Sequence, residues 1–226
     1  MEKEKNLELD RLVFFSDAVV AIAITLLALD LQLTPAGEHL VFSDIWNAWP
    51  RFLAFFLSFF MIAMFWKIHH EFFFHIQHID EKLMGFNLAW LVFITTLPFT
   101  TSLLSEHLSD LPAIFLYCLN IFMLSIFQNF IWDYACDRLI YLPGVPIDSP
   151  KETLLKSGTS DETITLFRLA CNIAMANALL ALLLSLWWPA VALVVLFSRI
   201  IFFRTAAIQW MERGLERRGR FGRGKH

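Results

Sequence analysis

The chain has 226 residues and a formal net charge of −3, with 58% hydrophobic and 17% charged residues. Soluble domains usually carry about 25% charged residues, so this composition excludes an ordinary water-soluble fold and indicates a membrane protein. Phenylalanine (24) and tryptophan (8) are abundant, and both suit a lipid-facing surface with aromatic belts at its edges. The cysteines Cys118, Cys136 and Cys171 match no metal-binding spacing and fall in or beside apolar segments, so we expect no disulfide framework.

Six apolar segments follow one another along the chain, and we expect each to cross the bilayer as a helix, since about 20 apolar residues span the hydrocarbon core. Their predicted ranges are 12–32, 51–74, 84–104, 111–132, 164–186 and 189–203. The last two form a tight hairpin, and a basic tail, 204–226, follows them. The sequence therefore predicts a single all-α membrane domain over residues 1–226.

Lysine and arginine are distributed unevenly between the predicted loops. Of the 18 such residues, this topology places only Arg51 on the side opposite the termini. That side carries four acidic residues instead: Glu38, Asp44, Glu106 and Asp110. Because cytoplasmic loops are enriched in Lys and Arg, we predict that both termini are cytoplasmic. The polar arm, 1–10, has mixed charge and no small-residue cleavage site, so we expect the first span to be retained.

Polar residues distinguish the first span from a plain membrane anchor. They are Arg11, Ser16 and Asp17 in its first two turns, Thr25 near its middle and Asp30 near its far end. A charge inside a membrane helix costs roughly 2.5–3.5 kcal/mol on insertion scales, and such residues usually mark a partner or a function. Asp30 either draws cations toward a mouth or caps the end of the helix, and both readings stay open. We expect the other spans to form a frame around this helix.

An aliphatic stripe follows one face of the predicted first helix, within about 40° of one line at 100° per residue: Ile22, Leu26, Leu29 and Leu33. Thr25 lies about 60° to one side of this line. Asp17 lies about 140° from Ile22, which directs the aspartate toward its own bundle. Periodicity alone leaves two readings open. The stripe packs against another helix, or it faces its own copies around a symmetry axis and forms a constriction that gates by dewetting.

A short motif lies at the start of the first span, where residues 11–17 read Arg-Leu-Val-Phe-Phe-Ser-Asp. This pattern, R-x-x-x-F-S-D, resembles the signature of the transmembrane protein 175 family of potassium channels. The match continues through Ala18, Ile22, Thr25 and Leu29. The resemblance implies a single six-span repeat of the bacterial type in the plasma membrane. It also implies a homotetramer whose first helices line a pore on the fourfold axis.

The resemblance further implies a passive, potassium-preferring cation channel with K+ as the permeant ion and no cofactor. The family's pore lacks the carbonyl filter of ordinary potassium channels, and this chain contains no TVGYG run. The family pattern places the constriction at Ile22, Leu26 and Leu29, with Thr25 offering hydroxyls to the ion. Potassium is less strongly hydrated than sodium, so a narrow apolar neck favours it modestly.

The resemblance assigns a second group of residues to a structural network that holds the first helix at its angle. This group consists of Arg11, Phe15, Ser16, Asp17, Trp66, His70 and Asn87. A buried aspartate needs hydrogen-bonding partners, and we expect Trp66, His70 and Asn87 to supply them. Arg11 and Asp17 lie about 120° apart around the helix, so we do not expect them to pair directly.

The histidine-rich segment 69–78 resembles the zinc motif H-E-x-x-H, but His70 and His75 are five residues apart instead of four. We therefore expect hydrogen bonding at the membrane edge and no metal site. A pH-sensing role stays open, because histidine titrates near neutrality.

Other function classes fit the sequence less well. The spans offer no nucleophile–base pair, so we do not expect an enzyme. A proton-coupled or secondary cation transporter is the main alternative, although we find neither an inverted repeat nor paired broken helices. The basic tail is explained by topology or by anionic lipid, so we expect no nucleic-acid partner.

Overall fold

A computed structural model describes residues 2–33, 39–137 and 153–200. Within these residues the regular structure is helical, apart from one antiparallel bridge between Ile76 and Leu155. The elements are α1 (Glu2–Leu27), the 3-10 turn η1 (Ala28–Asp30), α2 (Phe42–Asn47), α3 (Trp49–His75), α4 (Glu81–Glu106), α5 (Leu111–Cys136), α6 (Asp161–Leu184) and a last helix, Pro189–Ile200. The predicted basic tail and residues 138–152 of the long polar loop lie outside the described residues.

Five helices of the described chain are long and apolar enough to cross a membrane. They span Leu7–Asp30, Trp49–His75, Glu81–Glu106, Leu111–Cys136 and Asp161–Leu184, and they correspond to the first five predicted spans. The described residues are therefore mostly helical and arranged as in a multi-pass membrane protein. The sixth predicted span is described as far as Ile200, as the shorter apolar helix Pro189–Ile200, so its crossing stays a prediction.

Local chemistry fixes where several helices begin. The side chain of Asp80 accepts a 2.9 Å bond from Leu83 N and caps α4, and Ser160 accepts a 3.2 Å bond from Thr163 N at the start of α6. The hydroxyl of Tyr134, near the end of α5, donates to Asp80 Oδ2 at 2.6 Å. One carboxylate thus caps α4 and also ties it to α5.

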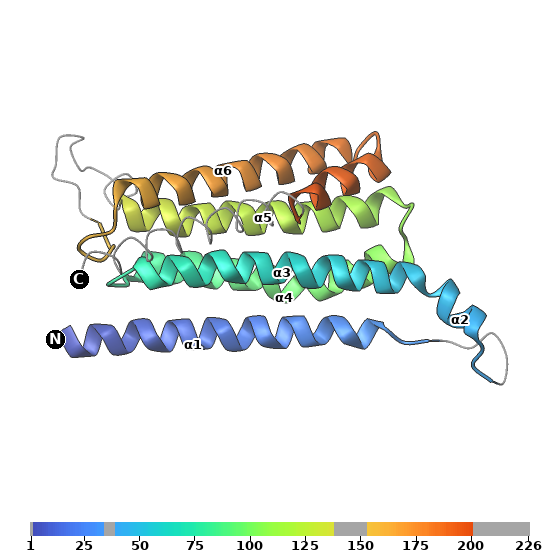
Figure 1. The fold of residues 1–226 in the computed structure, drawn as a ribbon, viewed down its shortest axis with the longest axis horizontal. Coiled ribbons are helices and arrows are strands. Elements are labelled where there is room, and N and C mark those ends of the chain that lie inside the picture. Colours follow the sequence, from blue (N-terminus) through green and yellow to red (C-terminus); the bar gives the residue numbers. More distant parts are fainter. Residues whose placement is uncertain (1, 34–38, 138–152, 201–226) are drawn as a thin grey trace, which may run out of the picture.

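The long helices run side by side in an elongated bundle, with α1 at one edge and α6 toward the other (Figure 1). α1 packs against α3 and α4, and α5 packs against α4 and α6. Large aromatic side chains fill the interior, including Trp90 and Trp132, which are fully buried. α1 is thus held by one side only.

Both ends of the first helix differ from the prediction. The arm 1–10 was expected to precede the helix, yet α1 already begins at Glu2. Its Glu, Lys and Leu residues are good helix formers, so the helix continues beyond the apolar span. At the far end the α-helix stops at Leu27 and tightens into η1, with a 3.2 Å bond from Leu31 N to Ala28 O. Such a turn satisfies carbonyls that a helix end leaves free.

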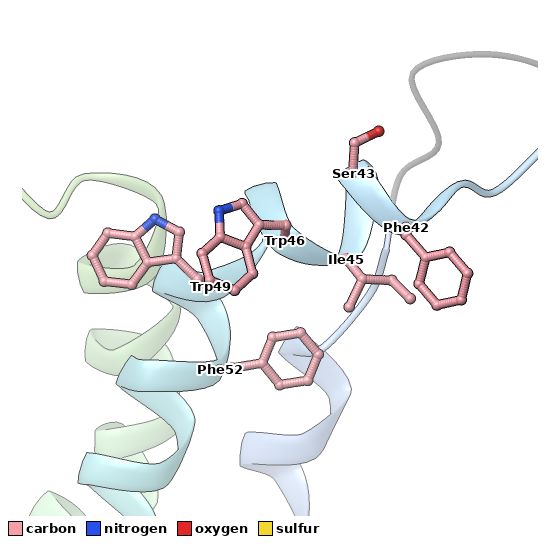
Figure 2. A pocket seen from close by; sticks show the side chains of 6 residues that line it. All are labelled: Phe42, Ser43, Ile45, Trp46, Trp49 and Phe52. Carbon is pink, nitrogen blue, oxygen red and sulfur yellow. The ribbon is translucent and has the colours of Figure 1, made fainter.

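Part of the predicted loop between the first two spans forms the short helix α2. Its apolar side, together with the start of α3, lines a groove of about 640 Å³ (Figure 2). The lining residues are Phe42, Ser43, Ile45, Trp46, Trp49 and Phe52. The opposite side of α2 borders a smaller groove of about 380 Å³ that includes Asn47, Arg51 and Glu106. Apolar and polar sides divided in this way are typical of a helix at the boundary between lipid and water.

An outward-facing helix and its hydrogen-bond network

α1 presents two faces of different character. The face that packs on the bundle consists of Leu9, Leu12, Ser16, Val20, Ala23 and Leu27, which are all buried and recur three or four residues apart. The opposite face is exposed in the single subunit. It carries the aliphatic stripe, whose exposed fractions are 59% for Ile22, 41% for Leu26 and 62% for Leu29. These three side chains therefore do not pack inside their own bundle.

Thr25 lies on the same outward face. Its hydroxyl donates a 2.8 Å bond to the carbonyl oxygen of Ile22, one turn earlier in α1. The hydroxyl proton thus points back into the helix, and the lone pairs of Oγ1 remain available on the outer side. Asp30 ends η1 and is half-buried, so it belongs neither to the exposed stripe nor to the bundle core.

Asp17 is turned away from the stripe and toward α3. Its Oδ1 accepts a 2.8 Å hydrogen bond from the indole nitrogen of Trp66. The carboxylate is half-buried, and Trp66 is 38% exposed. An indole N–H to an ionised carboxylate is a charge-assisted bond, which is stronger than a neutral one. This bond fixes the rotation of α1 against α3.

A second, fully buried chain of hydrogen bonds links α1, α3 and α4. Asn87 Nδ2 of α4 donates to Ser16 Oγ at 2.9 Å, and Ser16 Oγ donates to the carbonyl of Leu12 at 2.9 Å. Asn87 Oδ1 lies 2.7 Å from His69 Nε2 of α3. Because the amide oxygen only accepts, Nε2 of His69 carries the proton and donates it to Asn87. The His69 ring stacks on Trp90 at 4.4 Å.

The structure brings His69 into this chain, whereas the sequence had assigned that place to His70. His70 is exposed and contributes a ring contact with Trp66, at 5.5 Å between centroids. His69 lies on the inward stripe of α3 with Phe65 and Phe72, both fully buried. His69 shares this inward face because it follows Phe65 by four residues and precedes Phe72 by three. Most other positions of α3 are apolar as well, so the sequence alone does not mark this face.

Arg11 and Phe15 also differ from their expected places. Both were assigned to the structural network, yet both are exposed on the outward face of α1. At 100° per residue each lies within about 20° of the Ile22 line, so they extend the outward stripe toward the start of the helix. The side-chain hydrogen bonds that hold α1 to α3 and α4 thus form two branches, Asp17–Trp66 and Ser16–Asn87–His69.

No group of three or more His, Cys, Asp and Glu side chains suited to a metal ion occurs within residues 2–33, 39–137 and 153–200.

Comparison with known proteins bears directly on α1 to α4. Residues 11–98 match the family model described as endosomal/lysosomal potassium channel TMEM175. A potassium channel of Streptomyces collinus is 30% identical over 158 residues, which cover 66% of this chain and 75% of that protein. The chain belongs to the TMEM175 family. The resemblance of the R-x-x-x-F-S-D motif is thereby confirmed.

Further relatives and a solved structure also place the chain in the TMEM175 family. A potassium channel of Chamaesiphon minutus is 32% identical over 151 residues, 62% of this chain and 73% of that protein. The crystal structure of a lysosomal potassium-selective channel TMEM175 homolog from Chamaesiphon minutus superposes with a TM-score of 0.73 at 26% identity, over 88% of this chain and 97% of that chain. The cattle relative, named endosomal/lysosomal proton channel TMEM175, is 30% identical over 139 residues, 56% of this chain and 29% of that protein.

Proposed function

We propose that this TMEM175 protein is the subunit of a passive, potassium-preferring cation channel, in which four copies place α1 around a fourfold axis in the bacterial plasma membrane, with both termini cytoplasmic. One observation carries the proposal: the apolar stripe Ile22, Leu26 and Leu29 is exposed on a helix whose other face is fully occupied by its own bundle. A fourfold arrangement gives this stripe a partner, namely its own copies.

The stripe acts as a neck made of stacked apolar rings. Walls formed by Ile22, Leu26 and Leu29 offer water no hydrogen bonds, so an ion passes only by giving up part of its hydration shell. Potassium holds its shell less tightly than sodium and therefore passes more easily. The lone pairs of Thr25 Oγ1, whose proton is engaged by Ile22 O, partly replace the lost water.

The position of Asp17 also supports a neck without charged ligands. A carboxylate facing the axis would bind cations strongly and slow their release. Trp66 holds Asp17 against α3, about 140° around the helix from Ile22, so its charge orients α1 and does not coordinate the ion. Selectivity in this arrangement arises from dehydration and is modest.

A recording from purified protein in a planar lipid bilayer tests the proposal. With potassium on one side and sodium on the other, we expect single-channel current steps and a reversal potential displaced toward that of potassium. A current that saturates without unitary steps would instead identify a coupled carrier. A reversal potential that follows an imposed pH gradient would identify protons as the transported ion. Native mass measurement in mild detergent should give four chains per particle.

A further inference from the structure

Arg199, near the end of the last described helix, has its guanidinium group buried in the bundle. The residue is 9% exposed, and its Nη1 and Nη2 are buried without a hydrogen-bond partner in the described chain. Its Cζ lies 4.7 Å from the ring centroid of Phe65, a fully buried residue of α3. The ring face attracts the cation but satisfies the two N–H groups poorly, so the guanidinium lacks hydrogen-bond acceptors.

The guanidinium also lies far from both ends of α6. Asn177 of α6 donates to the carbonyl of Val195 at 2.9 Å, which sets the register between α6 and the last helix. The last helix runs back along α6 from Pro189, so Arg199, one turn beyond Val195, lies about 6 Å closer to the start of α6 than Asn177 does. Asn177 is about 24 Å along α6 from its first residue, so Arg199 lies beside the middle of that helix. A lipid headgroup does not reach this depth.

Another arginine of the same region shows what Arg199 lacks. Arg168 of α6 donates to Asp133 Oδ1 of α5 at 2.9 Å, so its charge is compensated. No carboxylate of the described chain forms an ion pair with Arg199. An unpaired buried charge is much more costly than a paired one, and arginines within membrane spans normally have a partner.

The surroundings offer polar contacts at this depth. Gln128 of α5 donates to the carbonyl of Phe65 at 2.9 Å. Its neighbour Asn129 donates a 2.7 Å hydrogen bond to Oδ1 of Asn172 in α6. Polar side chains of α5 thus reach both α3, at the residue whose ring faces Arg199, and α6.

We propose that Arg199 binds a small monovalent anion of the chloride type between α3, α6 and the last helix. The fork of the guanidinium presents Nη1 and Nη2 side by side, so one anion accepts from both donors and neutralises the charge. A doubly charged anion would leave a second charge unpaired. The proposal does not depend on the conduction pathway, because Arg199 lies on a helix distant in the bundle from the outward face of α1 (Figure 1).

The first test is thermal unfolding of the purified protein in detergent. The Tm in potassium chloride is compared with the Tm in potassium gluconate at the same potassium concentration. An anion that binds the folded state raises Tm with concentration. We expect a saturable rise in Tm with chloride, and its loss in Arg199→Met, which keeps an unbranched apolar side chain but removes the guanidinium group and its charge. Arg168→Met is the matched control and should retain the chloride response. A wild-type Tm independent of chloride, or an equal response in Arg199→Met, overturns the proposal.

Crystals grown in bromide provide a second test that needs no variant. An anomalous peak beside Nη1 and Nη2 of Arg199 is expected, with none beside Arg168. Water alone at both nitrogens, with no anomalous signal, overturns the proposal.

Discussion

Trp66 and Asp17 are joined by a 2.8 Å hydrogen bond from the indole nitrogen to Oδ1, across the contact between α3 and α1. The bond gives a charged residue of a membrane span a defined partner within its own subunit. It also sets which face of α1 is left outward, because a helix held at Asp17 necessarily presents Ile22 on the far side. The same bond therefore links the stability of the bundle to the position of the proposed neck.

Replacing Trp66 with phenylalanine should destabilise the subunit while leaving ion selectivity unchanged. The change keeps an aromatic ring beside His70 but removes the donor to Asp17. Losing a hydrogen bond to a charged group costs about 1.5–3 kcal/mol, which thermal unfolding in detergent would show as a lower Tm. Trp187→Phe is the matched control, since the Trp187 side chain is exposed and makes no hydrogen bond in the described chain. A Trp66→Phe protein with native Tm and a shifted reversal potential would place Asp17 in the ion path.

The two adjacent histidines should respond differently to the same substitution. His69→Phe preserves a ring to stack on Trp90 but leaves Asn87 Oδ1 buried without its donor, at a cost of about 1–3 kcal/mol. His70→Phe changes an exposed ring and should alter stability by about 0.5 kcal/mol or less. Chemical or thermal unfolding of the two variants in parallel measures the difference. The opposite order of stabilities would contradict the buried chain through Asn87.

Substitutions in the stripe should change conduction. Ile22→Asn or Leu29→Ala makes one ring polar or wider, so water enters more easily and an ion keeps more of its shell. We expect a higher unitary conductance and a reversal potential in mixed potassium and sodium closer to the non-selective value. Leu180→Ala, at a half-exposed position of α6, is the control and should leave both unchanged. Unchanged current in every stripe variant would mean that α1 does not line the pathway.

Cysteine cross-linking should report whether copies of α1 face one another. Ile22→Cys places a thiol on the outward face, whereas Val20→Cys, at a position 3% exposed, places it inside the subunit. The native cysteines are buried and unpaired, so the wild-type protein is a suitable background. Mild oxidation should give linked dimers on non-reducing gels for Ile22→Cys alone. Equal cross-linking of both variants, or of neither, would argue against a shared axis along α1.

The helices were predictable because long apolar runs require no knowledge of their neighbours, whereas the rotation of a helix was predictable only where polar residues mark one of its faces. α1 carries enough polar residues for its stripe and the direction of Asp17 to be read from periodicity. α3 is apolar on nearly every side, as expected for a helix between bundle and lipid, so its sequence hardly marks the inward face. The choice between His69 and His70 depended on that rotation: the family pattern pointed to His70, which contacts Trp66, whereas the hydrogen bond to Asn87 comes from His69.

Helix ends were harder to predict than spans for a related reason. Hydropathy locates where lipid begins, but backbone geometry decides where a helix stops. The charged residues that end the apolar segment near position 10 are themselves good helix formers, so α1 passes through this boundary unchanged. The turn after Leu27 depends instead on which backbone N–H groups bond to the last carbonyl oxygens of the helix. No side-chain pattern in the sequence predicts this bonding.

The 3-10 turn that ends α1 alters the pitch of the proposed neck. From Ile22 to Leu26 the chain rises about 6 Å along an α-helix. A continued α-helix would put Leu29 only about 4.5 Å further on and about 60° around. A 3-10 turn rises about 2 Å per residue and brings residues three apart into line, so Leu29 stands about 5.5 Å above Leu26 and more nearly over it. In the proposed neck the three rings would thereby be almost evenly spaced and nearly aligned along α1, so that an ion would meet successive apolar barriers at similar intervals.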